Sequence, residues 1–284
     1  MAYACAAGIV ALALIETGNA LLAPLRVPTE RDWRAAAAEV RAGFRPGDLI
    51  VTSPAWADPL LRMHLGDLIP LAVAGRLDDA RFGRIWEISQ RGARTPESNN
   101  GRVAQSSRHG ELTLRRYERS AAPVTFDFVA EWSRATVTRV TSAGQRSWCS
   151  HLPDRFECPD LPSQSVKAEL LEIDTSPHLA LATQPAGNST TVIEYDHVPL
   201  GRELAVGAGL HNVWLRKAGK GTVSLRVLVQ DRELGRIQAS SLTGWTLRRF
   251  DTSALVGQSL SVRFEITVDD PTARTLGLAA EARS

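Results

Sequence analysis

The chain has 284 residues, of which 44% are hydrophobic and 23% are charged, and its formal net charge is +2. This hydrophobic content supports folded cores and excludes global disorder, and the length accommodates two modest domains. A net charge this close to zero provides no strong field that would recruit nucleic acid, so we expect no nucleic-acid partner.

The N-terminal segment is the most apolar part of the chain. Ala2 to Ile15 is an unbroken apolar run, and the segment continues past Glu16 and Asn19 to Pro24. The run is shorter than the roughly 20 residues that span a bilayer, whereas residues 1–24 together reach that length. We therefore predict that residues 1–24 form a hydrophobic anchor or a signal segment, in which Gly18-Asn19-Ala20 resembles a cleavage site. A buried core helix is the remaining alternative.

The flanking charges conflict with the cysteines. Basic residues follow the segment at Arg26, Arg31 and Arg34, and none precedes it. The positive-inside rule then places the body of the chain in the cytoplasm. The hypothesis that reconciles this with a disulfide is that the chain is the tail of a larger multi-span protein. We expect a bacterial cell-envelope protein, anchored in the inner membrane with a periplasmic body, or exported with its signal cleaved.

Two of the three cysteines are predicted to form a disulfide. Cys149 and Cys158 lie in a polar, proline-containing stretch, where a bridge would contribute roughly 2–3 kcal/mol. Such bridges persist in oxidising compartments such as the periplasm. Free thiols and a metal site are the alternatives, but zinc would need two further ligands and only His151 is near. Cys5, in the apolar segment, is interpreted as a small buried hydrophobe.

Residues 25–164 are predicted to form a small α/β module with a loop and strands. Thr29 is a suitable N-cap for a helix that ends at Gly43. Apolar residues recur on one face of this helix, at Trp33, Ala36, Ala37 and Val40. We predict a second helix over 60–68 and strands over 49–52, 84–88, 111–117, 124–129 and 135–140. Residues 90–110 are polar without an apolar period, so we predict a mobile loop there.

Residues 165–284 are predicted to form an antiparallel β-sandwich of the jelly-roll type. The clearest strand is 261–268, in which apolar residues alternate with polar ones. Short strands with turn residues between them, and no helical period, are typical of sandwiches. The predicted fold class is therefore α+β, with an N-terminal hydrophobic helix, the small α/β unit and the C-terminal sandwich.

Two resemblances follow from these stretches. Residues 30–37, 46–51 and 84–87 give residues 1–90 a pattern that resembles the extramembrane C-terminal region of bacterial protein-mannosyltransferase-like membrane glycosyltransferases. This resemblance implies an accessory or truncated part without the catalyst. Residues 221–227, 244–245, 250–252 and 262–266 are similar to galactose-binding-like jelly rolls. That similarity implies a fold and no particular ligand site, because such folds host many functions.

Two pairs of residues are candidate ligand-binding residues. Trp56 and Asp58 follow the first predicted strand, where α/β units usually bind ligands; alternatively Trp56 packs and Asp58 caps the next helix. Trp214 and Arg216 are in phase on a predicted outer face of the sandwich, where an indole would stack on a sugar and a guanidinium would bind hydroxyls; alternatively Trp214 fills the core.

No catalytic residue, metal site or cofactor is predicted, because no HExxH or G-x-S-x-G motif occurs. The leading function is a non-catalytic envelope domain that contacts the membrane through its N-terminal segment and binds a glycan or a membrane glycosyltransferase. One alternative is an enzyme fragment, a glycosyltransferase or an envelope hydrolase, that uses acidic residues in 48–67, namely Asp48, Asp58 and Asp67. The other is a purely structural assembly module.

Overall fold

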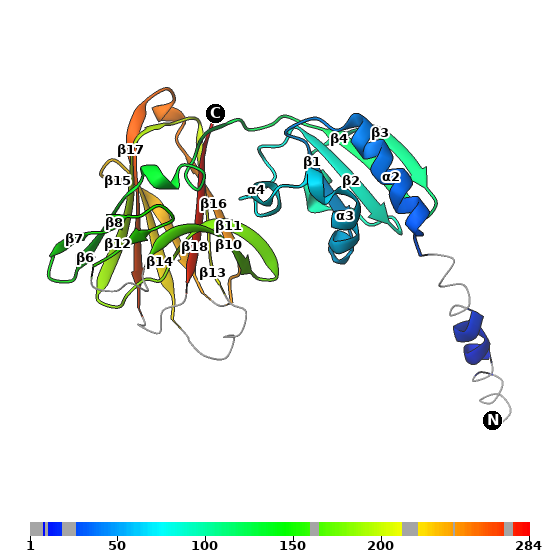
Figure 1. Ribbon diagram of the computed structural model, residues 1–284, viewed down its shortest axis with the longest axis horizontal. Coiled ribbons are helices and arrows are strands. Elements are labelled where there is room, and N and C mark those ends of the chain that lie inside the picture. The colour runs from blue at the N-terminus through cyan, green and yellow to red at the C-terminus, as the bar shows by residue number, and fades with distance from the viewer. Residues whose placement is uncertain are drawn as a thin grey trace. The chain divides into compact units, whose positions relative to one another are not determined.

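The computed structural model describes residues 8, 11–18, 27–159, 165–211, 221–240, 242–269 and 275–284 (Figure 1). The chain divides into two compact units. The first comprises Met1–Ile69 and Phe82–Ser120, and the second comprises Pro70–Arg81 and Ala121–Ser284. The segment Pro70–Arg81 thus belongs to the second unit although it lies within the sequence of the first.

Only part of the predicted N-terminal segment lies within the described residues. Residues 11–18 are helical, and the side chains of Leu12, Leu14 and Ile15 are more than half exposed. Across the described ranges, no helix combines the length and the apolar character needed to cross a bilayer. Cys5 and most of residues 1–24 lie outside the described residues, so the anchor and signal interpretations stay predictions.

The first unit is a mixed sheet with helices packed on it. The strand order is β1-β2-β4-β3, with β1 parallel to β2 and the other pairs antiparallel. These strands are β1 (Leu49–Ser53), β2 (Arg84–Gln90), β3 (Arg102–His109) and β4 (Leu112–Glu118). The longer helices are α2 (Glu30–Gly43) and α3 (Asp58–Leu65), with short 3-10 turns η2 (Ala55–Ala57), η3 (Gly66–Leu68) and η4 (Pro96–Ser98).

Helix α2 forms as its sequence predicts. Thr29 and Asp32 make a reciprocal capping box, in which each side chain accepts a hydrogen bond from the other residue's backbone N–H. Its apolar face is buried, through Trp33, Ala36, Ala37 and Val40. Its C-terminal Gly43 lies against the indole of Trp86, where a Cβ atom would come within 2.8 Å of the ring.

The prediction of a loop over 90–110 is wrong for its second half. Residues Arg102–His109 form β3, an edge strand paired with β4. The strand has no apolar alternation because the side chains that face α2 are polar and converge on Glu39. The Glu39 carboxylate accepts from Gln105 Nε2 at 2.6 Å and from Ser107 Oγ at 2.8 Å, and it lies 2.6 Å from His109 Nε2.

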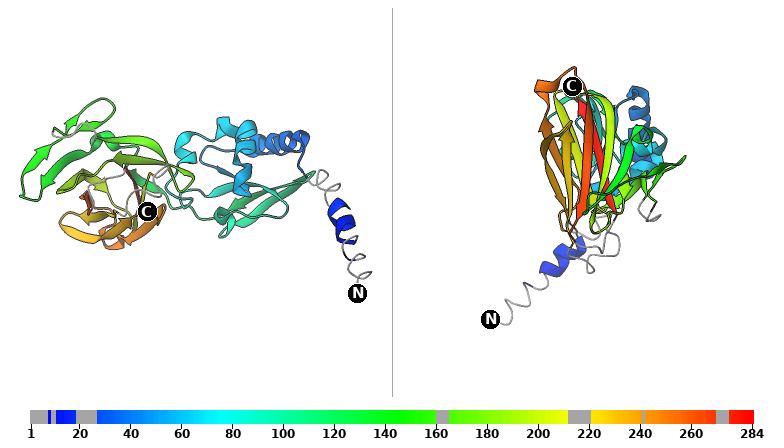
Figure 2. Two further views of the ribbon diagram at one scale, coloured as in Figure 1. Left: turned by 90° about the horizontal axis from the view of Figure 1, so that it is seen from below. Right: turned by 90° about the vertical axis from the view of Figure 1, so that its left-hand side faces the viewer.

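The second unit is a β-sandwich whose strands alternate between two sheets, as in a jelly roll (Figures 1 and 2). The larger sheet has the order β16-β13-β18-β11-β10-β9-β8, with β5 also paired to β18, and the smaller sheet has the order β15-β14-β17-β12-β6-β7. The strands of the larger sheet are β5 (Val124–Asp127), β8 (Ser150–His151), β9 (Phe156–Glu157), β10 (Val166–Ile173), β11 (Ser176–Thr183), β13 (Glu203–Leu210), β16 (Thr246–Asp251) and β18 (Leu276–Arg283). Those of the smaller sheet are β6 (Thr136–Thr141), β7 (Arg146–Trp148), β12 (Ser189–Pro199), β14 (Val223–Val229), β15 (Arg232–Ala239) and β17 (Ser259–Val268).

The sandwich begins earlier in the chain than residue 165, where we expected it. Strands β5 to β9 lie between residues 124 and 157, yet β5 pairs with β18 and β6 pairs with β12. The reason is non-local pairing, which a pass along the chain does not reveal. The apolar positions of 261–268 do face the core as predicted, since Val262, Phe264 and Ile266 are fully buried.

A buried ion cluster attaches Pro70–Arg81 to the sandwich. Arg283 is fully buried and donates to Asp78 Oδ1 and Glu281 Oε2, each at 2.7 Å. Burial alone would raise the pKa of Asp78, but the hydrogen bonds and charge of Arg283 hold it below its usual value. Helix α4 (Leu71–Ala74) precedes this cluster, and the next residue, Gly75, packs against β11, where its carbonyl accepts from Leu179 N.

Candidate functional site

The first predicted ligand-binding pair lies at the carboxyl end of β1. Trp56 is in η2 and is 64% exposed, as a binding residue would need to be. Asp58 opens α3, and its carboxylate accepts from Arg62 Nε at 2.6 Å one turn later. The structure therefore brings the indole to the surface but engages the carboxylate within its own helix.

The acidic residues proposed for an enzyme each have a separate partner. Asp48 is buried and accepts from Trp86 Nε1 at 2.9 Å. Asp67 forms a two-point ion pair with Arg41, both N···O distances being 2.7 Å, and this pairing lowers the pKa of Asp67. Asp48, Asp58 and Asp67 are therefore each bonded to a different residue. They do not form the cluster of converging carboxylates that the enzyme alternative requires.

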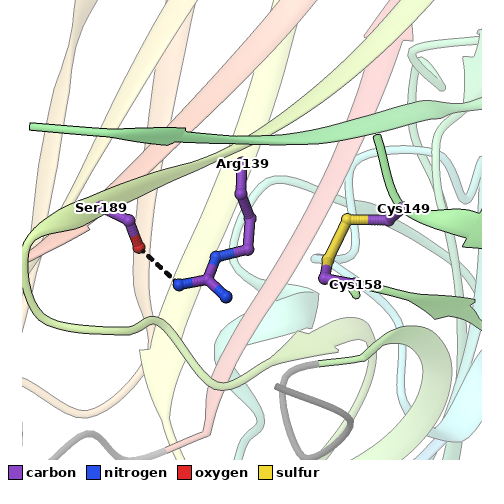
Figure 3. Close-up of a disulfide and its surroundings, with 4 residues drawn as sticks. All are labelled: Arg139, Cys149, Cys158 and Ser189. Atoms are coloured by element: carbon purple, nitrogen blue, oxygen red, sulfur yellow. Dashed lines mark hydrogen bonds between the residues drawn. A yellow bond between two sulfur atoms is a disulfide. The ribbon is translucent and has the colours of Figure 1, made fainter. Parts of the chain in front are cut away.

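The second predicted pair, Trp214 and Arg216, lies outside the described residues. The predicted disulfide is confirmed: Cys149 and Cys158 are bonded at 2.01 Å (Figure 3). Cys149 directly follows β7 of the smaller sheet, and Cys158 directly follows β9 of the larger one. The bridge thus links the end of β7, the edge strand of the smaller sheet, to the end of β9, which lies between β8 and β10 in the larger sheet.

An exposed tryptophan precedes this bridge. Trp148, the last residue of β7, is 63% exposed and pairs with Thr138 of β6. Val137 lies in the core, and successive residues of a strand point to opposite faces. Thr138 and Trp148 therefore point away from the core, onto the outer face of the smaller sheet.

Polar and charged side chains dominate the rest of that outer face. A row of residues that pair in register from strand to strand starts at Trp148 and crosses the whole smaller sheet. Its other members are Thr138, Val192, Glu265, Arg226 and Arg236. Arg226 bridges Glu265 at 2.7 Å and Glu233 at 2.8 Å, and Arg236 lies 2.8 Å from Glu233. The hydrogen bonds from Arg236 and Arg226 lower the pKa of Glu233. Acids and bases are thus interleaved on this face, without a field of one sign.

A hollow opens on the same face one row away. It measures about 620 Å³ and is lined by Glu194, Val229, Gln230, Asp231, Arg232, Ser261 and Arg263. Two strand spacings and two residues along the strand separate Trp148 from Glu194, which corresponds to roughly 12 Å. The hollow has the size of small-ligand sites, and its polar lining suits a hydroxyl-rich ligand.

We refer to Trp148 together with this row and the hollow as the outer-face site. Sequence reasoning missed Trp148, which stood within the cysteine stretch. The sequence did contain a signal. Trp148 directly precedes Cys149, and the residues two positions away on either side, Arg146 and Ser150, are polar, which is typical of a solvent-facing position on a strand. Trp245, in contrast, is half-buried and packs against the hydrophobic core.

Comparisons with known proteins find resemblance at the level of structure only. No family profile matches the chain, and no curated protein matches its sequence. The structure of the CBM51-2 and INT domains of ZmpB from Clostridium perfringens has a TM-score of 0.33 and 14% identity, over 52% of this chain and 37% of that one. The CBM51 of a Clostridium perfringens GH95 protein, in complex with methyl-galactose, has a TM-score of 0.30 and 10% identity, over 41% and 81%.

The family 11 carbohydrate-binding module of Lic26A-Cel5E from Clostridium thermocellum has a TM-score of 0.24 and 7% identity, over 42% of this chain and 82% of that one. The chain spans only 37% of the length of the ZmpB structure. The resemblance of residues 1–90 to membrane glycosyltransferases stays a prediction.

Proposed function

We propose that the sandwich binds a neutral oligosaccharide at the outer-face site and has no catalytic role there. The observation that carries this proposal is the exposed indole of Trp148 on a strand that the disulfide holds in place, beside a balanced polar face. A large aromatic ring left 63% exposed in an ordered strand has apolar area available for a ligand.

The chemistry of the site matches a sugar in two respects. The indole face offers an apolar surface for the C–H face of a pyranose ring, and carboxylates and guanidinium groups accept from and donate to hydroxyls. The separation of roughly 12 Å between Trp148 and Glu194 exceeds the reach of a single ring. We therefore expect an oligosaccharide that stacks on Trp148 and extends toward the hollow.

We further infer that the protein works in an oxidising compartment of the cell envelope. The disulfide supports this, because such bridges persist in the periplasm and are rare in the cytosol. Attachment to the membrane through residues 1–24, and association with a membrane glycosyltransferase, are part of the same proposal. Alkylation of thiols in intact cells, followed by mass spectrometry, tests the compartment: unmodified Cys149 and Cys158 support it, and their alkylation without prior reduction contradicts it.

The experiment for ligand binding is a glycan array probed with three forms of the full chain: the wild type, Trp148→Ala and Trp56→Ala. Trp56 is the matched control, since it is 64% exposed and lies in the other unit. We expect Trp148→Ala to weaken binding to the best glycan roughly 30-fold, because an aromatic hot spot contributes about 2 kcal/mol. We expect Trp56→Ala to bind like the wild type.

Two outcomes would overturn the proposal. If no glycan binds the wild type, the outer face is not a sugar site. If Trp56→Ala loses binding while Trp148→Ala keeps it, the ligand binds at the carboxyl end of β1 instead.

A further inference from the structure

A buried guanidinium that has no counter-ion among the described residues lies inside the sandwich. Arg139 of β6 is in phase with Val137, a core residue, so it points between the sheets rather than onto the outer face. It is only 8% exposed. Figure 3 shows its side chain on the same side of the strand as the disulfide, with Ser189 on its other flank.

Arg139 makes a single side-chain hydrogen bond within the part of the chain that the structure describes. Its Nη2 donates to Ser189 Oγ at 2.9 Å, whereas Nε and Nη1 are buried and have no acceptor among the described residues. No carboxylate of the described chain lies within ion-pair distance of it. A buried charge is normally paired, because taking an unpaired ion out of water is costly.

A second buried polar atom, which has no partner among the described residues, lies on the other sheet at Thr183. Thr183 ends β11 and is 2% exposed, and its Oγ1 has no hydrogen-bond partner among the described residues. Thr183 pairs with the core residue Val166, whereas the preceding Ala182 pairs with the half-exposed Lys167, so the side chain of Thr183 points inward. Only residues 184–188 separate Thr183 from Ser189, so both lie at the same end of the sandwich.

We propose that Arg139, Ser189 and Thr183 form a binding site for a carboxylate group, next to the Cys149–Cys158 bridge. The guanidinium offers charge-assisted hydrogen bonds, and the two hydroxyls can donate to the same anion. Arg139 carries one positive charge, and Ser189 and Thr183 are neutral, so the site matches a ligand group with one negative charge. A phosphate monoester carries nearly two and would leave an excess of negative charge in a buried place.

This site is separate from the outer-face site, because Arg139 and Trp148 point to opposite faces of the smaller sheet. Its ligand can be the carboxylate of an acidic sugar or of a small organic acid. Galacturonate, galactose and acetate are the three probes that distinguish these sources. Galactose differs from galacturonate only in having a hydroxymethyl group in place of the carboxylate, and acetate has the carboxylate without the ring.

The test is isothermal titration of the full chain with each probe at constant ionic strength, for the wild type, Arg139→Met and Arg146→Met. Arg146 is the matched control because it is exposed on the neighbouring strand. We expect carboxylate probes to bind the wild type and Arg146→Met, and Arg139→Met to bind them roughly tenfold or more weakly. Binding of galacturonate alone identifies an acidic sugar, and equal binding of acetate identifies a simple carboxylate.

Thermal melting without ligand gives an independent readout. Since the proposal has Arg139 unpaired in the free protein, Arg139→Met should melt at or above the temperature of the wild type. A large fall in its melting temperature would show that a partner within the chain neutralises Arg139, and would overturn the proposal. Equal binding of galactose and galacturonate, or no binding of any carboxylate, would also overturn it. If Arg139→Met does not fold, Ser189→Ala and Thr183→Val replace it in the titration and must weaken binding.

Discussion

Removal of the disulfide gives a quantitative test of how the sandwich edge is held. The bridge between Cys149 and Cys158 closes a loop with a sequence separation of 9. The chain-entropy relation for a loop of this length gives about 2.6 kcal/mol of lost stability at 25 °C. For a domain of 150–250 residues this corresponds to a fall in melting temperature of roughly 5–10 °C. Alanine at both positions avoids burying new polar groups at Cys158, which is fully buried.

Scanning calorimetry of Cys149→Ala/Cys158→Ala is the assay, and the transition of the first unit is the internal reference. The reduced wild type should melt like the double variant, and Cys5→Ala should melt like the untreated wild type. An unchanged melting temperature of the second unit, or destabilisation of the first unit alone, would contradict a stabilising role of the bridge.

Three further predictions concern the second unit. Arg283→Met should lower its free energy of unfolding by about 3–5 kcal/mol in denaturant titrations, because it removes the buried cation shared by Asp78 and Glu281 and leaves Asp78 with the half-exposed Arg249; wild-type stability would show that the cluster is not needed. Burial, and then the charge of Arg76, lower the pKa of His178 to about 4, so the folded state binds fewer protons than the unfolded state. The contribution of His178 to the free energy of unfolding should be fully present above pH 6.5 and decrease toward pH 4. His178→Phe should make the free energy of unfolding less dependent on pH in this range. Gly207→Val should cost about 1–3 kcal/mol in the same titrations, because a side chain there meets the ring of Trp245; a neutral effect would contradict this packing.

Local patterns in the sequence predicted the parts of the fold whose stability is local. The capping residue Thr29 and the apolar face of α2 are where they were expected, and the alternation at 261–268 corresponds to β17. The edge strand β3 was not predictable from an apolar period, because its inward side chains contact the polar Glu39. The start of the sandwich was not predictable either. We expected it at residue 165, but β5 already belongs to the sandwich because it pairs with the distant strand β18.

The candidate sites likewise divide into features that the local sequence indicated and features that depend on how distant strands pair. The disulfide was predictable because two cysteines in a short polar stretch have few other roles. Arg139 carried a signal that was not used: a charged residue in phase with Val137 within a predicted strand is directed into a core. The exposure of Trp148 depends on β7 being an edge strand, which only the sheet order reveals. Trp56 lies after β1 as its place in the sequence indicated, and the i,i+4 spacing of Asp58 and Arg62 was the available signal for their pairing.

Hydroxyl-radical footprinting of Trp148 and Trp56 tests whether a sugar binds on the outer face of the sandwich. Trp148 and Trp56 are 63% and 64% exposed, so they should oxidise at similar rates in the free protein. With a saturating amount of the best glycan from the array, we expect the oxidation of Trp148 to slow while that of Trp56 is unchanged. Protection of Trp56 alone, or of neither residue, would contradict a sugar site on the outer face of the sandwich.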